Sequence, residues 1–176
     1  MRKLILQLAV SLDGYIEGPN GEYDWCFTDQ DYGMKAFFER IDSAFYGRKS
    51  YELTQSMIDS MDSGDMPDFP ELQEFVFSTT LKDAKPGVII INRDIENEVN
   101  RIKNEPGKDI WLFGGADLTS SLMKLGLVDE ISLAVHPIIL GSGKPLFINL
   151  NNRIPLKLLS SISYSSGLVL MNYALI

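Results

Sequence analysis

The chain has 176 residues, of which 45% are apolar, and a formal net charge of -8. This length suffices for one domain with a sizeable core and is too short for two ordinary ones, so we expect a single domain over residues 1–176. The acidic balance argues against a nucleic-acid-binding surface, because neutralising phosphates requires clustered Lys and Arg. No stretch approaches the roughly 18 consecutive apolar residues of a membrane span.

The single cysteine and the first ten residues indicate the cellular compartment of the protein. Cys26 cannot form an internal disulfide, which fits the reducing cytoplasm. The segment from Met1 to Val10 could be mistaken for a signal peptide, but Gln7 interrupts it and no small-residue cleavage site follows. We therefore expect a cytoplasmic protein, and we interpret this segment as a first strand.

Strand-like and helix-like patterns alternate in the first half of the chain. An apolar run over 4–12 predicts a buried strand, and a long loop with several glycines follows to about Thr28. Thr28 and Asp31 have capping-box spacing ahead of a helical pattern from Met34 to Ile41. The elements expected next are a strand over 43–46, a helix over 48–57, an exposed acidic excursion over 59–70, strands over 74–78 and 88–91, and a helix over 94–103.

The second half continues this alternation and then ends with strands alone. A strand over 109–113 runs into a glycine pair and a helix over 117–125, which is typical of a mostly parallel sheet with covered faces. The strand-like runs that complete the chain cover 130–140, 156–164 and 168–175. The predicted fold class is therefore α/β, with a mostly parallel central sheet, an antiparallel C-terminal strand and flanking helices.

Two strand–glycine–helix junctions could hold phosphate groups, because glycine lets an anion approach the backbone and helix N-termini attract it. The junction from Phe113 to Leu118 is by itself equally compatible with a tight turn that binds nothing. The junction from Tyr46 to Tyr51 places Arg48 and Lys49 in the first helical turn, where they oppose the helix dipole. A bound phosphate is one explanation for these cations, and solvated surface side chains are the other.

Further candidate residues lie on loops and strand ends. The loop from Ala9 to Gly18, with Trp25 downstream, occupies the position where open α/β sheets usually bind ligands, and its glycines would let it move as a lid. Asp31 is most simply a helix cap. Gly141 to Lys144 combines backbone donors with one cation and could bind a phosphate or form a turn. His136 is the only histidine, which argues against a multi-histidine metal site, and it is most simply structural.

In their order and spacing these motifs resemble the dihydrofolate reductase-like superfamily, especially its riboflavin-pathway branch, which includes the reductase domain of the bifunctional riboflavin-biosynthesis protein. The resemblance extends from Leu4 to Ile176. The motifs that carry it are Ser11-Leu12-Asp13-Gly14, Gly47-Arg48-Lys49-Ser50, Gly114-Gly115, Val128-Asp129-Glu130 ahead of Pro137, and Leu140-Gly141-Ser142-Gly143. The resemblance implies a three-layer fold in which NADPH lies across the strand ends beside a flat heterocycle.

The resemblance also implies roles for individual residues. The cofactor residues it implies are Ala9 and Ile16 at the nicotinamide, Arg48, Lys49 and Ser50 at the adenosine 2′-phosphate with Gly47 before them, Ser78 and Thr79 beside the adenosine, and Gly114, Gly115, Ala116, Asp117, Leu118 and Thr119 at the pyrophosphate. The substrate residues it implies are Trp25, Asp31, Gly143 and Lys144. Asp31 would be the catalytic carboxylate that holds the ring and favours its protonation. No metal is implied, since the cofactor supplies the hydride chemistry.

Two departures from dihydrofolate reductases argue against folate itself. Those enzymes anchor the glutamate tail of folate with an arginine after the first glycine junction, and here no Lys or Arg occurs from Tyr51 to Leu81. Ala134 stands where the family's supporting threonine is found. The Gly141-Ser142-Gly143-Lys144 end resembles the riboflavin branch, and this resemblance implies 5-amino-6-(5-phosphoribosylamino)uracil or a relative as the substrate. The alternatives are a dihydrofolate reductase and a nucleotide-binding protein that has lost catalysis, and the resemblance also implies a homodimer.

Overall fold

The computed structural model describes residues 1–60 and 70–176, so most of the predicted acidic excursion over 59–70 lies outside the described residues. No helix in the described ranges is long and apolar enough to cross a membrane. In chain order the elements are β1 (Leu4–Ser11), β2 (Tyr15–Glu17), α1 (Met34–Arg40), β3 (Ile41–Gly47), α2 (Arg48–Ser60), β4 (Gln73–Phe77), β5 (Ile89–Ile91), α3 (Ile95–Asn104), β6 (Asp109–Gly114), α4 (Ala116–Lys124), β7 (Glu130–His136), β8 (Lys144–Pro145), β9 (Leu156–Ser163) and β10 (Val169–Leu175).

The central sheet has eight strands in the order β5-β4-β3-β6-β1-β7-β10-β9. Every neighbouring pair from β5 to β7 is parallel, whereas β10 runs antiparallel to both β7 and β9. The predicted fold class, a mostly parallel α/β sheet that ends with an antiparallel strand, is confirmed.

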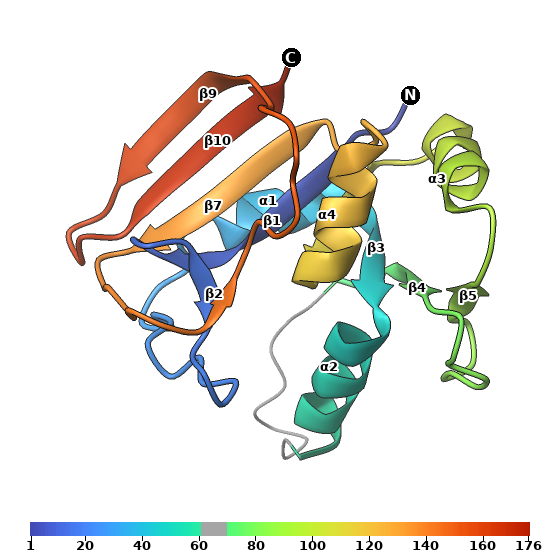
Figure 1. Cartoon of the computed structure of the whole chain (residues 1–176), viewed down its shortest axis with the longest axis horizontal. Helices are drawn as coiled ribbons and strands as arrows, with labels where there is room; N and C mark the ends of the chain where they lie inside the picture. The colour runs from blue at the N-terminus through green and yellow to red at the C-terminus, as the bar shows by residue number, and fades with distance from the viewer. Residues whose placement is uncertain (61–69) are drawn as a thin grey trace.

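Alternate residues of the central strand β1 face two different layers of helices. Leu4 and Leu6 are fully buried in a hydrophobic cluster with residues of α3 and α4, whereas Ile5 packs in a second cluster with Phe37 of α1. This alternation follows from the pleat of a strand, whose successive side chains point to opposite faces. Figure 1 shows α4 in front of the sheet and α1 behind it. The sheet is therefore the middle of three layers.

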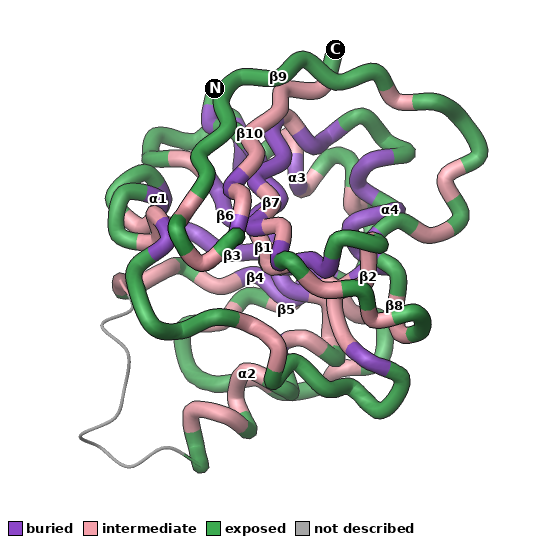
Figure 2. The backbone as a smooth tube through the Cα atoms, turned by 90° about the vertical axis from the view of Figure 1, so that its left-hand side faces the viewer, coloured by how far each residue is buried: buried purple, intermediate pink, exposed green. Residues whose placement is uncertain are grey.

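Burial is uneven across the sheet. Figure 2 shows the buried residues gathered on the central strands. By contrast β9, at the end of the strand order, is exposed along its whole length. Its exposed large apolar side chains are Leu156, Leu158, Leu159 and Ile162. One edge of the sheet thus presents an apolar strand to solvent.

The first helix is capped differently from the sequence-based prediction. Both carboxylate oxygens of Asp31 accept hydrogen bonds, one from the backbone N–H of Gly33 and one from that of Lys35, each at 2.9 Å. Gly33 has φ 83°, a left-handed conformation that glycine adopts without strain, and the helix begins only at Met34. The predicted capping box, with Thr28 as the cap, is therefore wrong: Gly33 is the N-cap residue, and the Asp31 side chain, two residues earlier, accepts the N–H of Lys35 in the first turn.

A second, two-stranded sheet was not predicted. The strand expected over 130–140 ends at His136, because Pro137 cannot donate a backbone hydrogen bond to a sheet. The chain then returns to β8, which pairs antiparallel with β2 inside the loop after β1. Gly143 permits this approach, because a Cβ there would collide with the carbonyl oxygen of Glu17. The pairing brings Lys144 beside the end of β1.

Candidate cofactor and substrate cleft

The carboxyl ends of the six parallel strands meet at one edge of the sheet, which is where open α/β folds bind ligands. Two cavities lie at this edge, and Ser50, Gly115 and Lys144 line both of them. Because these three residues are shared, the two cavities adjoin and form one cleft across the strand ends.

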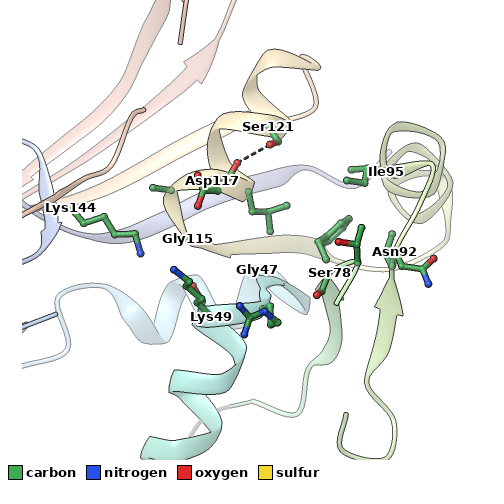
Figure 3. Close-up of a pocket in the computed structure, with 16 residues that line it drawn as sticks. Gly47, Lys49, Ser78, Asn92, Ile95, Gly115, Asp117, Ser121 and Lys144 are labelled. Atoms are coloured by element: carbon green, nitrogen blue, oxygen red, sulfur yellow. Dashed lines mark hydrogen bonds between the residues drawn. The ribbon is translucent and has the colours of Figure 1, made fainter. Parts of the chain in front are cut away.

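The first cavity has a volume of about 370 Å³ and lies between the two strand–glycine–helix junctions (Figure 3). The predicted cofactor residues that line it are Gly47, Arg48, Lys49, Ser50, Ser78, Thr79, Gly115, Ala116, Asp117 and Leu118. The structure thus brings together the phosphate-type junctions after β3 and β6 and the hydroxyl pair after β4. Such a set of backbone amides, hydroxyls and cations can hold the phosphates of a nucleotide.

Sequence reasoning missed other residues of this cavity. Asn92, Ile95 and Ser121 also line it. Asn92 directly follows the parallel strand β5, so the rule that ligands gather at the carboxyl ends of such strands could have found it. Ile95 and Ser121 carry no comparable signal, since one is an ordinary apolar helix residue and the other donates its hydroxyl to the carbonyl of Asp117 at 2.8 Å (Figure 3).

Two of the cations at the cleft have acidic partners. The guanidinium of Arg48 donates to both carboxylate oxygens of Glu52, at 2.9 and 2.8 Å. An exposed pair of this i,i+4 type stabilises a helix by only about 0.3–0.5 kcal/mol, so a phosphate can readily replace it. Nζ of Lys144 lies 3.3 Å from Oε1 of Glu17. Figure 3 shows Lys144 and Lys49 directed into the space beside Gly115.

Two features of the α4 N-terminus fit a phosphate-bearing cofactor. The hydroxyl of Thr119 is buried and has no hydrogen-bond partner among the described residues, although buried hydroxyls are nearly always bonded. A Cβ at Gly115 would come within 3.2 Å of Oγ of Ser50 and 3.8 Å of Nζ of Lys144. Glycine therefore keeps open a space that is bordered by a hydroxyl and an ammonium group.

The second cavity has a volume of about 440 Å³ and is mostly apolar. The predicted site residues that line it are Ala9, Ile16, Asp31, Ser50, Gly114, Gly115, Thr119 and Lys144. Its other large side chains, which were not predicted, include Tyr23, Phe27, Tyr32, Met34, Leu53, Met57, Trp111 and Phe113. A cavity of this size and lining suits a flat ring.

Asp31 lies at the rim of the second cavity and is exposed. Its capping hydrogen bonds use both carboxylate oxygens, but each oxygen has a second lone pair that can accept from a ligand. Capping and ligand binding are therefore compatible in this residue.

Trp25 and Gly143, which were predicted to bind substrate, do not line either cavity. The Trp25 ring packs edge-on against the ring of His136, with centroids 5.2 Å apart, and its indole N–H donates to the carbonyl of Glu22 at 3.2 Å. Gly143 lies against the backbone of Glu17. The structure places both residues behind the cavity walls, where they can support the loop after β1.

The imidazole of His136 fixes that loop to β7. Its Nε2 accepts a hydrogen bond from the backbone N–H of Phe27 at 3.0 Å, and its Nδ1 lies 2.9 Å from the carbonyl oxygen of Ala134. We infer that Nδ1 carries the proton, since the carbonyl can only accept. Burial lowers the pKa of His136, which favours this neutral form. The geometry agrees with the structural interpretation of this histidine.

The sheet between two layers of helices and the cleft across its strand ends define a protein of the dihydrofolate reductase-like fold. The chain belongs to the RibD C-terminal domain family, whose model matches residues 2–170. YyaP of Bacillus subtilis (strain 168) is 46% identical to it over 179 residues, a match that covers 98% of this chain and 94% of YyaP. Membership of this family supports a riboflavin-pathway reductase-like role.

Solved structures agree with this assignment. A protein assigned to riboflavin biosynthesis from Shewanella sp. PV-4 is 26% identical, with a TM-score of 0.80 and coverage of 99% of both chains. The deaminase/5-amino-6-(5-phosphoribosylamino)uracil reductase of Thermotoga maritima is 13% identical, with a TM-score of 0.73 over 99% of this chain and 57% of that one. Dihydrofolate reductase from Enterococcus faecalis, complexed with NADP(H), is 14% identical, with a TM-score of 0.67. The match covers 98% of this chain and 96% of that one. The last two show the fold alone.

Proposed function

We propose that this protein is an NADPH-dependent reductase of a small, flat heterocycle. The observation that carries the proposal is the division of one cleft into a half with phosphate-binding groups and a half with apolar and aromatic walls, joined at Ser50, Gly115 and Lys144. A dinucleotide with its reactive ring at the junction suits such a cleft. The fold shared with a dihydrofolate reductase bound to NADP(H) supports the same cofactor.

The first cavity would hold the adenosine half of the cofactor. Arg48, Lys49 and Ser50 offer two cations and a hydroxyl to the 2′-phosphate, which NADH lacks, so we propose NADPH. The backbone from Gly114 to Leu118 would bind the pyrophosphate. Thr119, whose own N–H donates to the carbonyl of Gly115, would offer its unpartnered hydroxyl from the adjoining second cavity. When bound, NADPH supplies the hydride that reduces the substrate.

The second cavity would hold the heterocyclic ring of the substrate. Asp31 would accept hydrogen bonds from ring donors and favour protonation of the substrate. The backbones of Ala9 and Ile16 would contact the nicotinamide end. The loop after β1, which the His136–Phe27 hydrogen bond secures, would shield the reacting groups from water.

The first substrate to test is 5-amino-6-(5-phosphoribosylamino)uracil, because family membership points to the riboflavin pathway. Consumption of NADPH is followed by its absorbance, for the wild type, for Asp31→Asn and for Asp24→Asn, a matched change at an exposed carboxylate of the same loop. Asparagine has one acceptor oxygen where Asp31 uses two, so Asp31→Asn can keep only one of the two hydrogen bonds to the start of α1, and the far-ultraviolet circular dichroism of the variant is compared with that of the wild type. We expect Asp31→Asn to bind NADPH normally and to lose about 100-fold in kcat, and Asp24→Asn to behave as the wild type.

The same assay separates the alternatives. Normal turnover by Asp31→Asn rejects its catalytic role. Turnover of dihydrofolate together with tight methotrexate binding identifies a dihydrofolate reductase. Binding of NADPH without reduction of any pyrimidine or pterin identifies a nucleotide-binding protein that has lost catalysis.

The family resemblance implies a homodimer, and we propose that its two copies associate through β9. This strand has no neighbour on its outer side in the sheet order, and it exposes Leu158 and Leu159, each about half accessible. Exposed apolar edge strands are prone to pair with another chain. A second copy of the same strand would cover these side chains by antiparallel pairing.

A further inference from the structure

We infer that the second cavity is built for a heterocycle that carries no phosphate or carboxylate group. This inference rests on the proposed function and narrows its substrate class. The favoured substrate of the riboflavin pathway carries a phosphate, so the cavity should contain a cation to receive it. The described residues of the cavity do not provide a free one.

The α2 side of the cavity is apolar. Leu53 and Met57, one turn apart on α2, form this wall. The sequence has no Lys or Arg from Tyr51 to Leu81, so neither the rest of α2 nor the segment up to Leu81 carries a cation. An anionic tail directed toward α2 would lose its hydration without gaining an ion pair.

The wall formed by the loop after β1 is aromatic and carries no cation. The rings of Phe27 and Tyr32, whose centroids are 6.2 Å apart, lie on this side. His136 also lines the cavity, but its Nε2 and Nδ1 are engaged with Phe27 and the carbonyl of Ala134, which leaves it neutral. This wall suits stacking and edge contacts with a flat ring.

The one cation among the described lining residues is Lys144, and it lies where the proposed function places the pyrophosphate of the cofactor. Its Nζ lies 3.3 Å from Glu17, and it stands at the junction with the first cavity, where Figure 3 shows it directed into the space beside Gly115. Two carboxylates, Glu17 and Asp31, line the same cavity. With two acidic groups against one paired ammonium, the local charge repels an anion and favours ring donors.

The ligand of this cavity is therefore an uncharged, planar, hydrogen-bond-donating ring, such as a free pyrimidine or its riboside. A reductase with this selectivity acts on the product of a reaction that removes the phosphate, or on a ring that never carried one.

The test compares 5-amino-6-(5-phosphoribosylamino)uracil with the same compound after removal of its phosphate, by calorimetric titration of the full chain with and without NADP⁺. We expect the riboside to bind at least about tenfold more tightly than its phosphate, because no ion pair offsets desolvation of the anion. Leu53→Arg places a cation on the α2 wall, at a side chain that is already 46% exposed. It should improve binding of the phosphate compound by about tenfold. Ser56→Arg, which adds the same charge to α2 at a position outside this cavity, should leave both affinities unchanged.

Equal or tighter binding of the phosphate compound by the wild type overturns the inference, and so does the absence of binding of both compounds. An equal gain from Leu53→Arg and Ser56→Arg also overturns it, because the effect would then come from overall charge. Failure of NADPH to bind contradicts the proposed function separately, since the riboside and its phosphate are compared without cofactor as well.

Discussion

The imidazole Nε2 of His136 accepts a hydrogen bond from the backbone N–H of Phe27 at 3.0 Å. This single bond joins the end of β7 to the loop that forms one wall of the substrate cavity. It requires a neutral imidazole, because a protonated ring has no acceptor. The position of the loop is therefore tied to the protonation state of one buried side chain.

This relationship predicts a pH dependence of stability. Burial lowers the pKa of His136 below its ordinary value of 6.5, so the unfolded chain takes up the proton at a higher pH than the folded chain. The stabilisation is complete above about pH 6.5 and declines as the pH falls toward the folded-state pKa. Urea unfolding at about pH 7.5 and about pH 5.5 should show a larger loss for the wild type than for His136→Gln, which does not titrate. Equal losses in both proteins would contradict this role of His136.

Breaking the ion pair between Lys103 and Asp129 should cause a large loss of stability. Nζ of Lys103 lies 2.7 Å from Asp129 and donates to the carbonyl of Leu127 at 2.9 Å, and the lysine side chain is only 4% exposed. Removing one partner of a buried pair costs about 3–5 kcal/mol, and the partial exposure of Asp129 reduces this to about 2–4 kcal/mol for Lys103→Met. The control Arg101→Met, in exposed pairs on the same helix, should cost at most about 1 kcal/mol. Chemical unfolding measures both, and similar losses would argue against a buried pair.

A side chain added at Gly143 should disturb the two-stranded sheet of β2 and β8. Alanine there would meet the carbonyl oxygen of Glu17 and would adopt φ 146°, so the β2–β8 contact should open. We expect Gly143→Ala to lose more stability than Gly141→Ala, which also has positive φ but meets no atom within 4 Å. Because β8 carries Lys144, only Gly143→Ala should also weaken cofactor binding. Equal effects of the two substitutions on unfolding would exclude this close contact as their cause.

The proposed dimer predicts a concentration-dependent mass. Analytical ultracentrifugation of the wild type should give twice the chain mass, and Leu158→Glu should give the monomer, because the charge would be buried against a second copy. Leu125→Glu, at an exposed leucine after α4, serves as the control and should remain dimeric. A monomeric wild type, or a dimer unaffected by Leu158→Glu, would reject association through β9.

Much of the fold could be predicted because its signals are local. The apolar run of β1 and the glycines that end β3 and β6 each mark an element within a few residues, and the structure confirms these elements. The β2–β8 pair could not be predicted, since strands of three and two residues have no periodicity and form only when distant segments meet. The left-handed conformation of Gly33 was missed for a related reason. Capping-box spacing alone does not reveal that such a residue precedes the helix.

The phosphate-binding half of the candidate site could be predicted from the sequence, whereas its apolar half could not. Glycines and cations at strand ends identify the phosphate half, whereas Leu53 and Met57 look like ordinary residues of an amphipathic helix. They become part of a cavity wall only because α2 and the loop after β1 line the same cavity. Their contribution to substrate selection therefore became visible only in three dimensions.

The most direct test of the proposed cofactor site is a fluorescence titration of the wild type and of Arg48→Ala with NADPH and with NADH, at one fixed salt concentration. We predict that the wild type prefers NADPH and that Arg48→Ala weakens NADPH binding by about 10- to 100-fold, toward the NADH value, while NADH binding stays the same. Failure of the wild type to bind either nucleotide, or equal affinity for both that Arg48→Ala does not change, would contradict an NADPH-dependent reductase.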